Sequence, residues 1–264
     1  LNLNDISFYL DRELWKLKDS NSSITYNQNT KEFKLINFFL ESKNQSINSD
    51  FRYKSTNDFD LKLITKDLKL HQFLSKNEKF DLSGFLSSEI IINQNEELQS
   101  ASANIITKNL VLNQNLIGDF DFSLSGSPIY NTYKIATSVV NDSKKNIQGF
   151  GNIFVVDKNI NLDIDFDLDN FDLSFLSSFG KNKVNKINGV VTGKLNLWGS
   201  MSDIKLKGQT FINKGNLYFP ITNTEYKIKD GTPIYFQDQS IKFVNTELVD
   251  TYEDTFAKAN GNLF

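Results

Sequence analysis

The segment from residue 160 to residue 169, INLDIDFDLD, alternates strictly between apolar and polar side chains. Successive side chains of a β-strand point to opposite faces, so this period of two predicts a strand with one buried face and one solvated face. In a helix the aspartates would be spread around the whole circumference. We therefore expect every second residue, Leu162, Ile164 and Phe166, to point inward, and Asp163, Asp165 and Asp167 to point outward.

The same alternation recurs through most of the chain. Further predicted strand faces carry Phe59, Leu61 and Leu63; Leu86, Ile90 and Ile92; Phe120 and Phe122; and Ile187, Val191, Leu195 and Leu197. Short polar breaks at residues 113–115, 157–159 and 230–231 predict hairpin turns between the strands. Closely spaced strands with such short turns favour an antiparallel meander over parallel crossovers. The sequence predicts an all-β fold.

Two stretches, at residues 70–74 and 173–179, instead have apolar residues three and four positions apart. Each predicts one or two helical turns. They lie at equivalent points of an internal repeat of about 105 residues, in which Gly84 matches Gly189 and Leu110 matches Leu217. The predicted organisation is a partial β repeat at 1–67, a full repeat at 68–170 and a third at 171–264. Since the chain opens on Leu1 and both ends read as strands, we expect a segment of a longer repeat array.

Composition excludes several classes of function. The 264 residues carry a net charge of −3, and Arg12 and Arg52 are the two arginines. Basic and acidic residues are interspersed, so the concentrated cationic face that a nucleic-acid binder needs is missing, and no nucleic-acid partner is expected. Cysteine is absent, which excludes disulfides, thiolate metal sites and cysteine nucleophiles.

No metal, cofactor or catalytic residues are predicted, and the chain is not expected to be an enzyme. Asp163, Asp165 and Asp167 begin like a calcium-binding loop, but Leu168 replaces its glycine and Ser174 its final glutamate. His71 is the single histidine, so a histidine metal cluster or a Ser-His relay cannot form. Gly149-Phe150-Gly151 lacks the third glycine of a dinucleotide-binding turn and is interpreted as a strand bend.

A longer pattern lies between residues 187 and 243. Ile187, Gly189, Val191, Gly193, Leu195, Leu197 and Gly199 form a glycine-punctuated strand, followed by Leu206 and Gly208, then Gly215 and Leu217. Tyr226 and Ile228, Ile234 and Phe236, and Ile241 and Phe243 complete it. This order of motifs resembles the TamB family, the translocation and assembly module subunit, in its Bacteroidota forms. Residues 33–49 are also similar to this family.

The resemblance implies an elongated, curved antiparallel sheet that forms a U-shaped groove with an apolar interior. It implies a periplasmic segment of an inner-membrane-anchored envelope protein that links the two membranes. The partners it implies are phospholipids and, through parts outside this chain, a TamA-like outer-membrane barrel of the Omp85 class. The activities it implies are lipid transport and support of outer-membrane protein assembly.

The alternating faces supply candidates for the lining of such a groove. They are Phe59, Leu61, Leu63, Leu86, Ile90, Ile92, Phe120, Phe122, Ile160, Leu162, Ile164, Phe166, Leu168, Ile187, Val191, Leu195, Leu197, Ile204, Leu206, Leu217 and Phe219. If the groove is open, a charge at Val191 or Leu195 is expected to leave the melting temperature nearly unchanged. The alternatives are a structural envelope spacer with a closed core and a β-solenoid carbohydrate-binding protein, although the long repeat argues against the solenoid.

Overall fold

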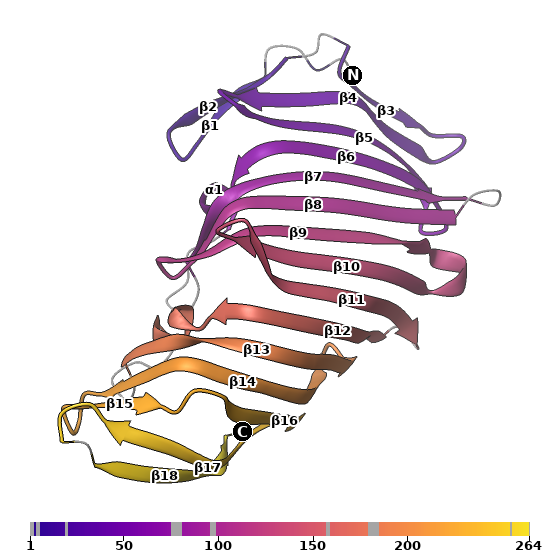
Figure 1. Ribbon diagram of the computed structural model, residues 1–264. Helices are drawn as coiled ribbons and strands as arrows, with labels where there is room; N and C mark the ends of the chain where they lie inside the picture. Colours follow the sequence, from indigo (N-terminus) through magenta and orange to yellow (C-terminus); the bar gives the residue numbers. More distant parts are fainter. Residues whose placement is uncertain are drawn as a thin grey trace. The chain divides into compact units, whose positions relative to one another are not determined.

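The computed structural model describes residues 3, 6–18, 21–74, 81–95, 99–156, 159–178, 185–253 and 255–263. Eighteen strands form a long antiparallel sheet (Figure 1), so the predicted all-β class is confirmed. The strands are β1 (Ser7–Leu10), β2 (Glu13–Leu17), β3 (Ser23–Asn27), β4 (Glu32–Ser42), β5 (Gln45–Ser55), β6 (Asp58–Lys69), β7 (Leu82–Gln94), β8 (Gln99–Leu112), β9 (Asn115–Ser127), β10 (Thr132–Asn141), β11 (Lys144–Val156), β12 (Asn159–Asp172), β13 (Asn185–Ser200), β14 (Asp203–Phe219), β15 (Thr224–Ile228), β16 (Thr232–Asp238), β17 (Ser240–Asp250) and β18 (Phe256–Leu263).

Short helical segments interrupt the strands at both predicted places. Helix α1 (Leu70–Phe73) follows β6, and the 3₁₀ helix η2 (Ser174–Ser178) follows β12, which confirms both predictions within the described residues. A third segment, the 3₁₀ helix η1 (Pro128–Tyr130), was not predicted. It joins β9 to β10.

The strands form a meander in which most strands pair with the next one along the chain. The predicted turn at residues 113–115 is confirmed, because residues 113–114 form the turn between β8 and β9. The turn predicted at 157–159 includes residues 157–158, which lie outside the described residues. The hairpin predicted at Asp230-Gly231 is wrong: β15 and β16 both pair antiparallel with β14 and run in the same direction. These two residues interrupt a continuous run of strand, and the chain continues beyond them in the same direction.

The chain divides into two compact units. Unit 1 comprises Leu1–Lys76, Leu82–Leu110 and Asp119–Ile135, and unit 2 comprises Asn77–Asp81, Val111–Gly118 and Ala136–Phe264. Strands β1 to β7 therefore belong to unit 1 and β11 to β18 to unit 2. The three repeat boundaries predicted from the sequence stay a prediction.

Six strands contain a residue with left-handed backbone geometry whose N–H donates to a side-chain oxygen of a later segment. In unit 1 the pairs are Asn37 with Asp50, Asp67 with Ser87 and Asn109 with Asp119. In unit 2 they are Asn170 with Thr192, Lys214 with Asp230 and Asn245 with Asn260. Register shifts accompany several of these residues, so they are β-bulges, which bend a strand and increase its twist.

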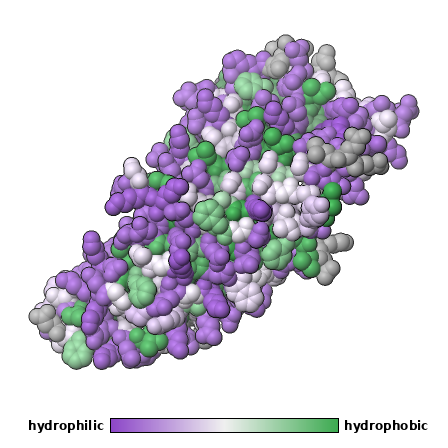
Figure 2. Space-filling view, turned by 45° about the vertical axis from the view of Figure 1, so that its right-hand side comes forward, coloured by the Kyte–Doolittle hydropathy of each residue, from purple (hydrophilic) through white to green (hydrophobic). Residues whose placement is uncertain are grey.

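Little of the apolar surface is fully enclosed. The accessible surface is 16828 Å², whereas two compact globular proteins of half this mass would together expose about 14,000 Å². Within the described residues, the buried apolar side chains are Leu3, Trp15, Leu40, Leu68, Ile135, Val139, Ile164, Val191, Ile212, Ile228 and Ile234. Most other aliphatic and aromatic side chains are half-buried or exposed, and Figure 2 shows several of them in green among purple hydrophilic neighbours.

Candidate functional site

In unit 1 the predicted lining residues lie side by side on one face of the sheet. Leu61 on β6 pairs in register with Phe51 on β5 and with Ile92 on β7, and Phe51 pairs with Leu35 on β4. Side chains in register on neighbouring strands point to the same face, so these four form a continuous apolar row. Every one of them is half-buried. Neighbouring rows add the predicted residues Phe59, Leu63 and Ile90.

A β-bulge extends this face beyond Thr65. The register of β6 against β7 shifts between Thr65 and Leu68, so Leu68 pairs with Leu86. Without the extra residue, strict alternation would turn Leu68 to the polar face. The bulge at Asp67 therefore keeps Leu68 and the predicted lining residue Leu86 on the apolar face.

The same face of unit 1 is closed at one end. Trp15, Leu40 and Leu68 form a buried cluster against which Phe38, Ile47 and Leu86 pack. Trp15 is 1 % exposed, and its ring meets Phe73 of α1 edge-on at 5.8 Å between centroids. The hairpin of β1 and β2 and helix α1 thus contribute the cover at this end.

In unit 2 a second apolar strip crosses β12, β13 and β14. Ile164 pairs with Leu197, which pairs with Leu206, and Phe166 pairs with Leu195. Ile164 is buried and Asp165 exposed, and Asp163 and Asp167 are also exposed, so the predicted facing of β12 is confirmed. Leu162, Phe166, Leu168, Leu195, Leu197 and Leu206 are half-buried.

Beyond this strip, unit 2 has an enclosed core. Val191, Ile212, Ile228 and Ile234 form a buried cluster, and Val191 is 6 % exposed. Val191 is therefore not the open position that the sequence suggested for a tolerated charge, because Ile212, Ile228 and Ile234 of the neighbouring strands enclose it. Leu195, four residues later on the same face, is half-buried and remains a candidate for an open surface.

The remaining predicted residues lie at different depths. Phe120 and Phe122 on β9 are half-buried, as are Ile187, Leu217 and Phe219 in unit 2. Ile160 and Ile204 lie near strand ends and are 47 % and 37 % exposed. The structure brings the unit 1 candidates of β6 and β7 together and, separately, the unit 2 candidates of β12, β13 and β14.

Sequence reasoning missed several residues of both faces. In unit 1 these are Phe33, Leu35 and Phe51, and in unit 2 they include Phe171, Phe236 and Phe243. Phe33, Leu35 and Phe51 do alternate with polar residues, so the period of two that marked the other strands was also the signal for them. Phe171 lies one position off the pattern of β12, because the bulge at Asn170 shifts the register.

The polar face of β12 carries the aspartates in a hydrogen-bonded row. The side-chain amide of Asn196 donates to Asp163 Oδ1 at 2.9 Å and to Asp165 Oδ1 at 3.0 Å. Lys194 Nζ lies 3.4 Å from Asp167 Oδ1. Among the described residues, no group of three or more acidic or histidine side chains is arranged to hold a metal ion.

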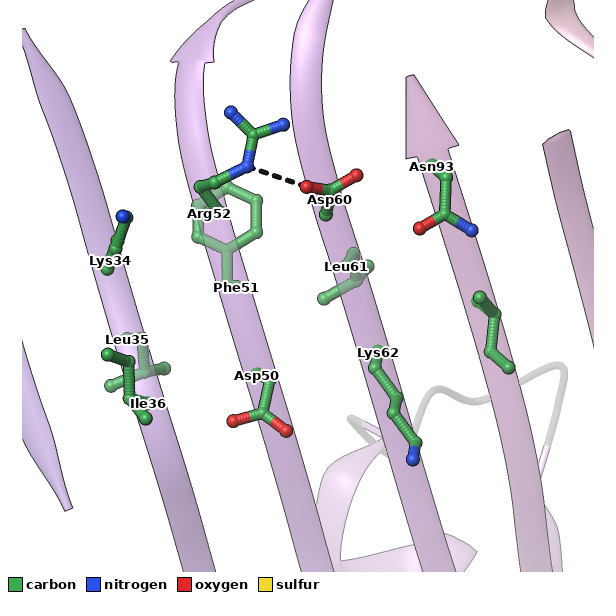
Figure 3. Close-up of a pocket in the computed structure, with 11 residues that line it drawn as sticks. Lys34, Leu35, Ile36, Asp50, Phe51, Arg52, Asp60, Leu61, Lys62 and Asn93 are labelled. Carbon is green, nitrogen blue, oxygen red and sulfur yellow. Dashed lines mark hydrogen bonds and ion pairs between the residues drawn. The ribbon is translucent and has the colours of Figure 1, made fainter. Parts of the chain in front are cut away.

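A small pocket lies between the strands on the polar face of unit 1 (Figure 3). Its volume is about 240 Å³, and its charged lining residues are Lys34, Asp50, Arg52, Asp60 and Lys62. The Arg52 guanidinium donates to Asp60 Oδ2 at 2.6 Å and lies 2.7 Å from Asp58 Oδ1. Asp60 and then Asp58 raise the pKa of Arg52, and Arg52 holds the pKa of Asp58 below its ordinary value. Arg52 is thus paired with two aspartates, and the pocket is best explained as a structural ion-pair cluster.

Unit 1 also contains a carboxylate among several donors. Glu13, 8 % exposed, accepts hydrogen bonds from Lys69 at 2.6 Å, Lys43 at 3.0 Å and Gln45 at 2.7 Å. The hydrogen bond from Lys69, then those from Lys43 and Gln72, lower the pKa of Glu13 to about 2. These donors hold the Glu13 carboxylate in a structural cluster of ion pairs and hydrogen bonds.

The other motifs have structural roles. His71 lies on α1, with Nε2 3.4 Å from Asp11 Oδ2. Gly149 and Gly151 lie within β11, where a Cβ at Gly151 would stand 2.0 Å from the Asp163 carbonyl oxygen. Close packing of β11 against β12 therefore requires a glycine at this position.

Comparison with family models, curated proteins and solved structures finds no match for this chain. In the described part of the chain, no helix is long and apolar enough to cross a membrane. The half-buried apolar rows of unit 1 and unit 2 are the candidate functional surfaces.

Proposed function

We propose that this chain is a segment of a TamB-like envelope scaffold that holds lipid acyl chains on the apolar faces of its sheet. The observation that carries the proposal is the register of half-buried apolar side chains across neighbouring strands. In unit 1 one such row runs from Leu35 through Phe51 and Leu61 to Ile92. Such a surface is apolar along its length and is not enclosed by a second sheet among the described residues.

Acyl chains suit such a surface energetically. Each CH₂ group removed from water contributes about 0.8 kcal/mol, so a sixteen-carbon chain contributes on the order of 10 kcal/mol. Extended apolar surfaces otherwise promote association, and they usually mark a binding site for lipid or protein. A lipid tail satisfies the apolar face while its headgroup stays in water.

The proposal includes a repeated, curved architecture. Helices α1 and η2 divide the eighteen described strands into three sets of six. The bulge of Asp67 on Ser87 corresponds to that of Asn170 on Thr192, because each pair lies on the strands just before and just after such a helix. Gly84 and Gly189 lie on β7 and β13, and Leu110 and Leu217 on β8 and β14, as the proposed repeat requires. Bulges repeated in this way support a U-shaped groove, since they bend strands in a consistent place.

The biological setting of the proposal comes from the resemblance of residues 187–243 to the TamB family. In this setting the segment lies in the periplasm and carries phospholipids between the membranes. It supports outer-membrane protein assembly through an Omp85-type barrel that contacts other parts of the protein. The segment itself has no enzymatic role.

A structural spacer with a closed core is the second candidate. The buried clusters around Trp15 in unit 1 and Val191 in unit 2 favour it locally. These clusters enclose only part of each face, whereas the rows through Leu61 and Leu195 are half-buried.

The proposal is tested by purifying the chain from bacterial membranes in mild detergent and analysing bound lipids by mass spectrometry. The expected result is phospholipid bound in a fixed molar ratio to the protein. An excess of short-chain lipid should displace it. A folded, monodisperse protein without lipid, and without uptake of added lipid, would favour the spacer.

A further inference from the structure

A pocket in unit 2 lies at the junction of the apolar face with polar side chains. Its volume is about 520 Å³, within the range of small-molecule sites. The apolar part of its lining includes Leu116, Phe171 and Phe175, and the Phe171 and Phe175 rings lie 5.6 Å apart. Phe171 also packs against the Val191 cluster, so it is a lining residue that the pocket shares with the apolar face of unit 2.

Two bulge residues line this pocket. Asn170 on β12 and Lys214 on β14 both have left-handed backbone geometry, with φ of 49° and 54°. Neither is a glycine, so each conformation carries a strain that its hydrogen bond to Thr192 or Asp230 offsets. β-bulges often re-aim a side chain next to a functional site, and two on one pocket suggest such a site.

The lining carries two lysines and two aspartates, which differ in how many of their polar atoms already have a partner in the protein. Lys144 and Lys214 are exposed, and neither ammonium has an ion-pair partner among the described residues. Of the two acids, Asp172 accepts the Ser174 N–H at 2.7 Å, which leaves Asp142 as the acid without such a bond in the part of the lining that the structure describes. The pocket thus offers two cations and two carboxylates beside an apolar floor, and Asp142 is the carboxylate that keeps both oxygens available to a ligand cation.

We infer that this pocket binds the zwitterionic headgroup of a phospholipid. The phosphate lies between the ammonium groups of Lys144 and Lys214, and the headgroup ammonium meets Asp142. The acyl chains leave over Phe171 toward the apolar face. Asp142 disfavours a free phosphate dianion at the same place, because like charges repel. This inference rests on the proposed function and adds a fixed anchoring point for the headgroup.

The test compares ligands with identical short acyl chains on the whole 264-residue chain. Dihexanoyl phosphatidylethanolamine is measured against dihexanoyl glycerol, which lacks the headgroup, and against phosphoethanolamine, which lacks the tails. The phospholipid is expected to bind at least about tenfold more tightly than either. If none of the three binds, the proposed function itself fails. If the glycerol lipid binds as tightly as the phospholipid, the apolar face stands and the headgroup site is overturned. Equal binding of phosphoethanolamine would show a site for free solutes and would also overturn the lipid assignment.

Three variants identify the site. Lys144→Gln and Lys214→Asn each remove a cation, and asparagine tolerates the left-handed backbone at position 214. Each is expected to weaken phosphatidylethanolamine binding about tenfold without affecting dihexanoyl glycerol. Asp142→Asn is expected to shift the preference toward phosphatidylglycerol. Lys194→Gln is the matched control, because Lys194 is an exposed lysine of unit 2 outside this lining. Equal effects of Lys194→Gln and Lys144→Gln would contradict the site.

Discussion

The backbone N–H of Asn170 donates a hydrogen bond of 3.1 Å to the hydroxyl of Thr192. This contact joins β12 to β13 at the point where their register shifts. It stabilises the left-handed backbone of Asn170 inside β12. As a result, Phe171, which follows the bulge, lies on the same apolar face as Leu168, which precedes it. The bulge thus shifts the alternation of β12 by one residue, and the apolar side chains before and after it lie on the same face of the sheet.

We predict that Asn170→Ala lowers the free energy of unfolding of unit 2 by about 1 kcal/mol, because alanine disfavours a left-handed backbone. Asn170→Gly is expected to cost less, since glycine has no Cβ to clash in this conformation. Urea denaturation followed by the loss of β-sheet circular dichroism measures both. Equal losses for the two variants would mean that the bulge is not under backbone strain.

Strand facing was predictable from sequence wherever alternation is unbroken. In β12 the period of two placed Ile164 inward and Asp165 outward, because an uninterrupted strand leaves no other arrangement for ten alternating residues. The helices α1 and η2 were also predictable, since apolar spacings of three and four are incompatible with a strand.

The bulges were not predictable, and they account for most of what was missed. On β14, Ile212 and Leu217 share a face although they are five positions apart, because Lys214 is an extra residue. Asp230-Gly231 resembles a hairpin turn, but Asp230 instead accepts the N–H of Lys214. The depth of a side chain was also beyond the sequence: Val191 and Leu195 look alike on one strand, and the enclosure by β15, β16 and β17 distinguishes them.

The Glu13 cluster predicts an acid-dependent loss of stability in unit 1. Hydrogen bonds, first from Lys69, hold the folded-state pKa at about 2, below the ordinary value of 4.5. A depressed folded-state pKa stabilises the protein above the unfolded-state pKa, and this contribution disappears as the pH falls from about 4.5 toward 2. Glu13→Gln is expected to lower stability at pH 7 and to flatten the dependence on pH in this window. Urea midpoints at several pH values measure both effects, and parallel curves for the two proteins would contradict the role of Glu13.

β13 and β14 lie so close together at Gly208 that a side chain at this position is expected to destabilise the protein. A Cβ at this position would stand 2.2 Å from the Lys194 carbonyl oxygen, and φ is +145°. We expect Gly208→Ala to cost about 2 kcal/mol or more, because backbone atoms must shift to relieve the contact. Gly261→Ala is the control, since a Cβ there meets nothing within 4 Å. Thermal melting of the two variants is the measurement, and similar melting temperatures would show that the two strands can separate at no cost.

The last prediction distinguishes an open lipid-binding face from a closed core by charges placed on one strand. Leu195 is half-buried, and on its own face it pairs with Phe166 and Gly208. Leu195→Lys is expected to leave the melting temperature nearly unchanged, because the long side chain can reach water, and to abolish phospholipid co-purification.

Val191 supplies the matched position, since it lies on the same face but is enclosed by Ile212, Ile228 and Ile234. Val191→Asp is expected to cost several kcal/mol, because an unpaired charge cannot remain in such a cluster. Melting temperature and bound lipid are measured for both variants and for Lys194→Gln, which changes an exposed lysine on the opposite face of the same strand. If the face is open, the two variants must give different results: Val191→Asp unfolds, whereas Leu195→Lys stays folded but carries no lipid. If both charges unfold the protein, and the unaltered chain carries no lipid, β13 is enclosed along its whole length and the chain is a spacer.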